Sequence, residues 1–192
     1  MKIFWLGPSR KFLENYLPLQ GDEAFFTEEP LRRPFPELET FDFLVSYGYR
    51  HLVSKDVLER FRGRAINLHI SYLPWNRGAD PNLWSFLEDT PKGVSIHHMT
   101  EMLDAGDILC QTPLYFEATE TLRSSYEALS QSVEKLFQEY WPEIKRGKIN
   151  SRPQPDGGSV HRKRDAEKYQ YLLTRGWDTT VGELLGKALC KK

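Results

Sequence analysis

Two polar side chains at the end of an apolar run are the residues in this sequence best suited to chemistry. Asn67 and His69 lie two apart in the run 65–70, and Pro74 is expected to stop this strand. Residues two apart on a strand point to the same face. An asparagine N–H can donate to an oxygen that gains negative charge, and a histidine can exchange a proton near neutral pH. The pair therefore indicates acyl-transfer chemistry.

A carboxylate further along the chain completes this set of groups. Asp104 lies in the segment 103–107, after the strand-like run 94–99, and an aspartate can hold an imidazole in one tautomer. No serine or cysteine occupies a nucleophile elbow, so we expect direct attack by a substrate amine rather than an acyl-enzyme. The alternatives are structural: Asp104 as a turn former, and Asn67 and His69 as strand-end residues.

An open α/β sheet is the predicted scaffold for these groups. The apolar runs 3–7, 43–47 and 65–69 predict buried strands. Helices are predicted from Pro8-Ser9-Arg10, with Ser9 as cap, to Tyr16, and over residues 54–61. Strands that alternate with helices at this spacing predict right-handed crossovers and a mostly parallel sheet. Ligands bind beyond the carboxyl ends of such strands, which is where the Asn67–His69 pair is expected.

The second half of the chain combines strands with one long helix. Asp80-Pro81 is a typical helix start, residues 94–99 alternate like a half-exposed strand, and residues 107–116 predict another strand. Apolar residues recur at helical spacing from Leu122 to Tyr140. We expect residues 1–146 to form the catalytic domain. Residues 147–192 are expected to pack on it, with an extended tail over residues 147–168 and a small helix over residues 177–189.

Composition narrows the class of protein. The chain has 192 residues, a net charge of −1 and two cysteines. This charge argues against binding to nucleic acid or to an anionic membrane. The cysteine content suits a reducing compartment, and no apolar run has transmembrane length, so we predict a cytoplasmic protein. His97 and His98 with His69 could suggest zinc, but neighbouring strand residues face opposite ways. We therefore predict no metal site.

Five sequence blocks in one register carry a resemblance to a known family. They are Asn67-Leu68-His69, Leu73-Pro74, Arg77-Gly78, Gly93-Val94-Ser95-Ile96-His97 and Leu103-Asp104-Ala105-Gly106-Asp107-Ile108-Leu109. Together they resemble the 10-formyltetrahydrofolate-dependent formyltransferases. The resemblance implies a Rossmann-like sheet, here with an abbreviated N-terminal half, and 10-formyltetrahydrofolate as cosubstrate. It also implies that Asn67, His69 and Asp104 are the catalytic residues.

The resemblance implies binding residues as well. The folate slot would be lined by Tyr49, Arg50, His51, Leu52, Val53, Glu101, Met102, Leu103 and Asp107. Candidate substrate contacts are Ser9, Arg10, Tyr72, Trp75, Arg77 and Asn82. Ser9 and Arg10 could bind a phosphate at a helix start or simply cap the helix. Tyr72 and Trp75 could stack on a base or sugar or serve in packing. His97 is expected to pack or hydrogen-bond beneath the site.

The segment Asn76-Arg77-Gly78-Ala79-Asp80-Pro81-Asn82 is similar to the sugar-nucleotide branch of the family. This similarity implies formyl transfer to the primary amine of an amino-deoxysugar linked to UDP or dTDP. The partners would be this sugar and folate, without nucleic acid or membrane, and a homodimer stays open. The alternatives are another amine such as an aminoacyl group, hydrolysis of the formyl donor, and a non-catalytic folate-binding protein.

Overall fold

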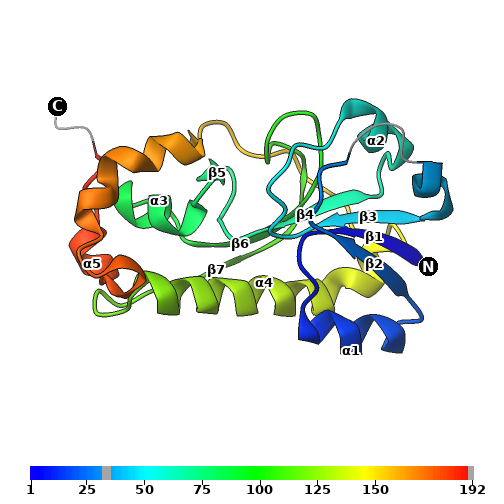
Figure 1. The fold of residues 1–192 in the computed structure, drawn as a ribbon, viewed down its shortest axis with the longest axis horizontal. Coiled ribbons are helices and arrows are strands. Elements are labelled where there is room, and N and C mark those ends of the chain that lie inside the picture. The colour runs from blue at the N-terminus through cyan, green and yellow to red at the C-terminus, as the bar shows by residue number, and fades with distance from the viewer. Residues whose placement is uncertain (32–35, 190–192) are drawn as a thin grey trace. The chain divides into compact units, whose positions relative to one another are not determined.

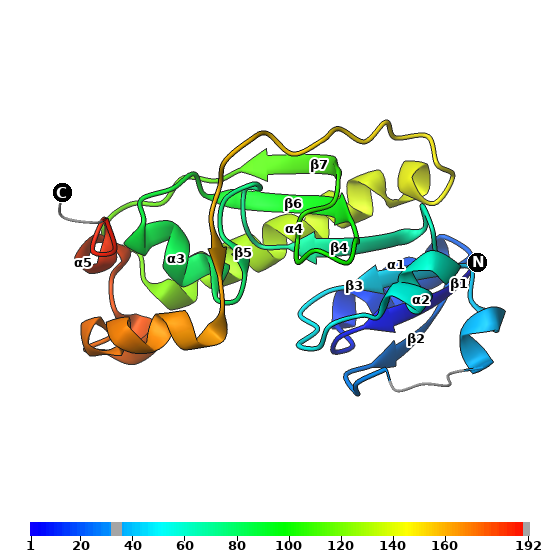
Figure 2. The same cartoon turned by 90° about the horizontal axis from the view of Figure 1, so that it is seen from above.

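A computed structural model describes residues 1–31 and 36–189, and it contains a six-stranded sheet with helices on both sides (Figure 1). The strand order is β2-β1-β3-β4-β6-β7. The strands are β1 (Lys2–Leu6), β2 (Glu23–Thr27), β3 (Phe43–Ser46), β4 (Ala65–His69), β6 (Gly93–His98) and β7 (Ile108–Pro113). β2, β1, β3 and β4 pair in parallel, whereas β6 and β7 run in opposite directions (Figure 2). The predicted open, mostly parallel α/β sheet is confirmed.

The helices and short strands complete the chain. The α-helices are α1 (Lys11–Leu19), α2 (Lys55–Arg60), α3 (Pro81–Leu87), α4 (Leu122–Ile144) and α5 (Val181–Leu184). Within the described residues, the 3₁₀ helices are η1 (Pro36–Thr40), η2 (Lys163–Leu172) and η3 (Gly176–Asp178). β5 (Arg77–Gly78) and β8 (Val160–His161) form a separate parallel pair. No helix among residues 1–31 and 36–189 has the length and apolar character needed to cross a membrane.

Two compact units share the chain. The first comprises residues 1–69, 96–110 and 134–153, and the second comprises residues 70–95, 111–133 and 154–192. The boundary after residue 146, drawn from composition, stays a prediction. The expected extended tail over residues 147–168 is only partly right, because η2 begins at Lys163. The small helix expected over residues 177–189 is limited to η3 and the four-residue α5.

Alternating side chains of β1 build the two layers of the first unit. Trp5 packs edge-on against Phe137 of α4, at 5.5 Å between ring centroids. Phe4 and Leu6 instead join a buried cluster with Leu58 of α2 and Phe61, which follows it. Figure 1 shows α1 and α4 on one side of β1 and its neighbouring strands, and α2 on the other side. Burial on both sides explains why the strand is an unbroken apolar run in the sequence.

The structure corrects three local predictions and adds one strand that was not predicted. β2 was not predicted, because its exposed residues break the apolar pattern. Ser9 is not the cap of α1, since the N-cap position belongs to Arg10 and carries no side-chain cap bond. β6 is buried along nearly its whole length rather than half-exposed, because β4 and β7 flank it within the sheet. β4 ends at His69, five residues before Pro74, so the proline does not stop the strand.

Candidate active site

Asn67, His69 and Asp104 come together in the first unit. The amide Nδ2 of Asn67 donates to Oδ1 of Asp104 at 3.0 Å. The other carboxylate oxygen, Oδ2, lies 3.8 Å from Nε2 of His69. The side chains of His69 and Asp104 are about nine-tenths buried, so charges there interact more strongly than on the surface. A carboxylate, an imidazole and an amide thus form one polar cluster.

The geometry of β4 explains why Asn67 and His69 lie together in this cluster. Asn67 and His69 are the third and fifth residues of β4, and both contact the same carboxylate. They lie at the carboxyl end of a parallel strand, which is the edge where open α/β sheets bind ligands. The predicted placement of these two side chains on one face is therefore confirmed.

Backbone geometry in the segment 104–107 holds the carboxylate in place. Asp104 has a positive φ of 49°, a left-handed conformation that aspartate tolerates better than most residues. Gly106 lies so close to the end of β6 that a Cβ on this residue would be 1.9 Å from the carbonyl oxygen of His98. The close approach requires glycine at position 106 and thereby sets the path of the loop that carries Asp104.

His97 is a fourth member of the cluster. Its Nε2 lies 3.3 Å from Nδ2 of Asn67 and 3.5 Å from Oδ1 of Asp104. Its Nδ1 lies 2.8 Å from the carbonyl oxygen of His98. The sequence predicted a packing or hydrogen-bonding place beneath the site, and the contacts agree with it. Burial lowers the pKa of the neighbouring His98, against a bond to the Ala65 carbonyl that raises it.

The described part of the chain contains no set of side chains that could bind a metal ion. Residues 1–31 and 36–189 hold no group of three or more histidine, cysteine, aspartate or glutamate side chains with the geometry of a metal site. The histidines of the cluster instead use their ring nitrogens on Asp104 and on a backbone carbonyl.

The predicted folate residues form two loops of the first unit that expose apolar side chains. Leu52 is 78%, Met102 71% and Leu103 45% exposed. An ion pair of 3.5 Å connects Lys55, the first residue of α2 after the loop 49–53, to Glu101 in the second loop. Large exposed apolar side chains mark ligand or partner sites when they gather. Met102 and Leu103 directly precede Asp104 in the chain, and Leu52 belongs to the other loop.

The remaining predicted folate residues have mixed surroundings. The hydroxyl of Tyr49 donates to the carbonyl of Glu29 and accepts from the N–H of Leu31, and burial raises its pKa. Val53 packs against the core of the first unit. Arg50, His51 and Asp107 are exposed. The backbone carbonyl of Asp107 accepts from the N–H of His98.

Ser9 and Arg10, two predicted substrate contacts, are engaged within the first unit. The hydroxyl of Ser9 donates to Glu14 at 2.8 Å. The guanidinium of Arg10 pairs with Glu134 at 3.2 Å and lies 4.2 Å above the ring of Tyr47. Tyr47 also donates to Glu134, at 3.1 Å. Because Glu134 compensates the charge of Arg10, the phosphate-binding interpretation of this helix start becomes weaker.

The other predicted substrate contacts lie in the second unit. Asn82 is 5% exposed, donates to the carbonyl of Leu122 and accepts from Ser125. A side chain buried in this way is structural, so Asn82 is a poor candidate for binding substrate. Tyr72 and Trp75 are half-buried. Nε and Nη2 of Arg77 both donate to Oε1 of Gln154, at 3.0 and 2.8 Å.

Sequence reasoning missed several residues that hold these side chains. Gln154 and Glu134 are single polar residues without a recognisable motif, and their partners are 77 and 124 positions away in the chain. Tyr47 was predicted only as the last residue of a buried strand. The Pro-Gln-Pro-Asp-Gly-Gly run at 153–158 did mark an extended segment, but nothing in it indicated which loop it would contact.

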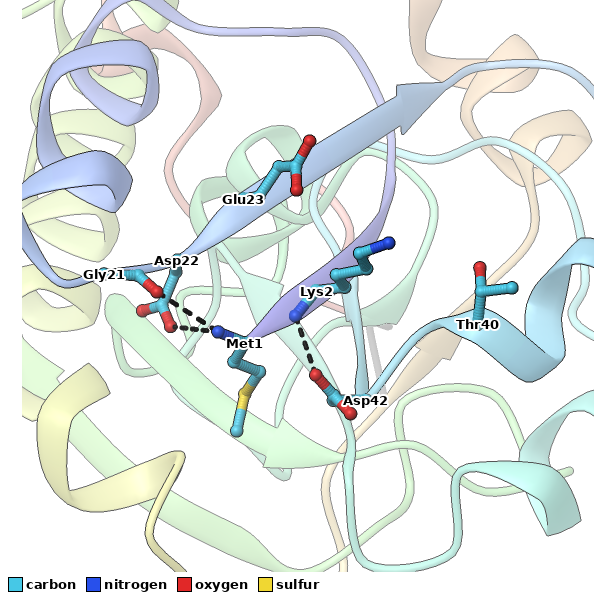
Figure 3. A pocket seen from close by; sticks show the side chains of 7 residues that line it. All are labelled: Met1, Lys2, Gly21, Asp22, Glu23, Thr40 and Asp42. Atoms are coloured by element: carbon cyan, nitrogen blue, oxygen red, sulfur yellow. Dashed lines mark hydrogen bonds and ion pairs between the residues drawn. The ribbon is translucent and has the colours of Figure 1, made fainter.

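A pocket of about 550 Å³ occurs elsewhere in the first unit (Figure 3). It lies beside the amino ends of β1 and β2, the edge opposite to the Asn67–His69 strand end. There the N-terminal amine lies 3.5 Å from Asp22, and the N–H of Lys2 donates to Asp42. The lining residues are Met1, Lys2, Gly21, Asp22, Glu23, Thr40 and Asp42. None of them was predicted as a site residue.

The fold and the polar cluster together define a class, and comparison with known proteins identifies it. Residues 36–140 match the model of the formyl transferase family. Since this region is more than half of the chain, the protein belongs to that family, as the sequence predicted.

Among solved structures, the chain is similar to the formyltransferase PseJ from Anoxybacillus kamchatkensis. The identity is 55%, the TM-score is 0.95, and the match covers 98% of this chain and 100% of that one. The PseJ structure is a complex with UDP-4,6-dideoxy-4-formamido-L-AltNAc and tetrahydrofolate. The predicted resemblance to the sugar-nucleotide branch is thereby confirmed.

Two further matches are more distant. A sugar N-formyltransferase from a Shewanella species shares the fold, with a TM-score of 0.77 at 18% identity over 88% of this chain and 79% of that one. The methionyl-tRNA formyltransferase of Bacillus cytotoxicus is 31% identical over 137 residues, which are 69% of this chain. This chain spans 44% of that protein.

Proposed function

We propose that the protein transfers the formyl group of 10-formyltetrahydrofolate to the primary amine of a UDP-linked amino-deoxysugar. The observation that carries the proposal is the contact of Asn67 and His69 with one buried carboxylate, Asp104, in a member of the formyl transferase family. The 55% identity with PseJ, whose structure holds a UDP-formamido-sugar and tetrahydrofolate, supports both substrates and favours UDP over dTDP.

The proposed reaction is direct transfer between two nitrogens. The amine of the sugar attacks the formyl carbon, a C–N bond forms, and the carbonyl oxygen takes negative charge in a tetrahedral intermediate. Asn67 and protonated His69 would stabilise that oxygen. The bond from the formyl carbon to the folate nitrogen then breaks, and the proton lost by the amine passes to this nitrogen. Asp104, through its contact with His69, would hold the imidazole in orientation or orient a water that relays this proton.

The exposed apolar side chains support the proposed folate site. Leu52, Met102 and Leu103 would cover a planar ring system, because burying apolar surface of this kind contributes about 25 cal/mol per Å². The predicted lining by Tyr49, Arg50, His51, Val53, Glu101 and Asp107 remains part of the proposal. Tyr72, Trp75 and Arg77 remain proposed contacts to the nucleotide sugar, and Ser9 and Arg10 are weaker ones.

Further parts of the proposal concern partners and location. The net charge of −1 supports a protein that does not bind nucleic acid. Cys110 is a free thiol, in keeping with the proposed cytoplasmic location. Homodimer formation also stays a prediction, and sedimentation of the purified protein would test it.

Product analysis with defined acceptors tests the proposed reaction. The purified protein is incubated with 10-formyltetrahydrofolate and, in separate reactions, a UDP-linked 4-amino sugar, a dTDP-linked 3-amino sugar, methionyl-tRNA or no acceptor. We expect a formamido-sugar with the UDP substrate. Formate in every reaction would indicate a hydrolase, formyl-methionyl-tRNA would indicate an aminoacyl acceptor, and folate binding without turnover would indicate a non-catalytic protein.

Substitutions in the cluster test the assigned roles. Asn67→Ala and His69→Ala should each reduce kcat by about 10²-fold or more, the range seen when an oxyanion donor or a general acid–base group is removed. Asn15→Ala, at an exposed position of α1, is the matched control and should keep full activity. Wild-type kcat in both cluster variants would contradict the assignment.

A further inference from the structure

His97 has the most enclosed position in the polar cluster. It is the fifth residue of β6, which pairs beside β4 in the sheet. The whole residue is 1% exposed, yet its ring contacts both Asn67 and Asp104. Its ring also meets that of His69 edge-on, at 6.2 Å between centroids. A residue so deeply buried contacts the reacting groups without itself facing substrate.

The hydrogen bonds of His97 determine which ring nitrogen carries the proton. Nδ1 lies 2.8 Å from the backbone carbonyl oxygen of His98. A carbonyl oxygen only accepts, so Nδ1 must donate and carries the hydrogen. In the neutral ring, Nε2 is then an acceptor, and the N–H of Asn67 at 3.3 Å is a donor to it.

The two acceptors beside Asn67 determine the orientation of its amide. The NH₂ group has two hydrogens, and Nδ2 has an acceptor for each: Oδ1 of Asp104 at 3.0 Å and Nε2 of His97 at 3.3 Å. A flipped amide would place its carbonyl oxygen against a carboxylate oxygen and a ring lone pair. Both contacts would be repulsive, so His97 and Asp104 together exclude the flipped orientation.

We propose that His97, as the Nδ1–H tautomer, is a positioning residue for formyl transfer, because it orients the amide of Asn67. The inference rests on the proposed function. Its consequence for the reaction is that both N–H groups of Asn67 are held before the oxyanion forms. When the oxyanion forms, the N–H directed at His97, whose bond is the longer of the two, would donate to both acceptors, while the bond to Asp104 keeps the amide in place.

The tautomer can be observed without any enzyme assay. Long-range ¹H–¹⁵N spectra of the wild-type protein labelled with ¹⁵N-histidine distinguish Nδ1–H from Nε2–H rings, and His97→Leu assigns the signal. We expect the Nδ1–H form for His97 at neutral pH. A ring protonated at Nε2 alone would overturn the proposal, whether or not the protein transfers formyl groups. Absence of transfer by the wild type would instead count against the proposed function.

Kinetics of matched variants test the positioning role. His97→Leu removes the acceptor and should lower kcat about 10- to 100-fold, as for other residues that orient a catalytic group. The KM values for folate and sugar should stay within about twofold, since His97 faces neither substrate. His97→Gln restores an acceptor for Asn67 and should recover most of kcat.

His98→Leu, on the same strand, is the control, because it leaves the backbone carbonyl that His97 uses, and its kcat should match that of the wild type. Equal loss of kcat in His97→Gln and His97→Leu would overturn the proposal, because only packing would then matter. Wild-type kcat in His97→Leu would overturn it as well. Thermal melting of each variant shows whether the protein under assay is folded.

Discussion

Gly106→Ala should inactivate the protein by displacing a carboxylate that the substitution does not touch. A Cβ at position 106 would lie 1.9 Å from the carbonyl oxygen of His98, whereas real contacts are essentially never shorter than 3.0 Å. The loop must therefore move by at least about 1.1 Å. Asp104, two residues away, accepts from Asn67 at 3.0 Å, so a shift of this size takes the pair beyond hydrogen-bonding distance. Misplacement by about 1 Å can cost about 10²-fold in rate.

The assay is the steady-state formation of formamido-sugar by folded protein, with folding verified by thermal melting. We expect kcat to fall by about 10²-fold or more, and stability to fall by about 1–3 kcal/mol from the overpacking. Gly63→Ala is the control: its φ is 73°, and nothing lies within 4 Å of the added Cβ. It should lose about 1–2 kcal/mol of stability, the cost of a left-handed conformation for a residue with a Cβ, and no activity. A folded Gly106→Ala protein with wild-type kcat would refute the argument.

Three further predictions concern stability and thiol chemistry. Gly158→Ala should destabilise the protein by clearly more than the ~1–2 kcal/mol expected for Gly157→Ala. Both residues have positive φ, but only at position 158 does a Cβ clash, 2.1 Å from the Pro74 carbonyl oxygen. Urea unfolding measures both, and equal losses would contradict the prediction. Burial lowers the pKa of His98, so its contribution to stability should be complete above pH ~6.5 and should decline as the pH falls through the lower folded value. In His98→Gln, the free energy of unfolding should decline less steeply between pH 7.5 and 5 than in the wild type. An unchanged slope would contradict this role of His98. Burial raises the pKa of Cys110 to about 12, so iodoacetamide should modify this thiol only slowly at pH 8 in the native protein and rapidly in urea. Peptide mass spectrometry measures both rates of modification, and equal rates would contradict the prediction.

The apolar runs made the central strands predictable, but they left the edge of the sheet hidden. β1 and β3 are buried along nearly their whole length, so their sequences are hydrophobic runs, and β4 is apolar except for Asn67 and His69. β2 lies at the edge and exposes Glu23 and Phe25. Its pattern is therefore weaker than that of a central strand. Only pairing with β1 makes it recognisable.

The identities of the reacting groups were encoded locally, since an amide and an imidazole two apart on a strand must share a face whatever the rest of the chain does. The local sequence also provides an aspartate at position 104, which tolerates a left-handed backbone, and a glycine at position 106, which allows the close approach to β6. By contrast, 37 residues separate Asn67 from Asp104 and 30 separate it from His97. Distances between such positions follow from sheet order and loop path. The tertiary structure alone decided three outcomes: His97 is a second acceptor for Asn67, Glu134 neutralises Arg10, and Asn82 is buried. Each of them depends on which side chains come within 3–4 Å of one another when the chain packs.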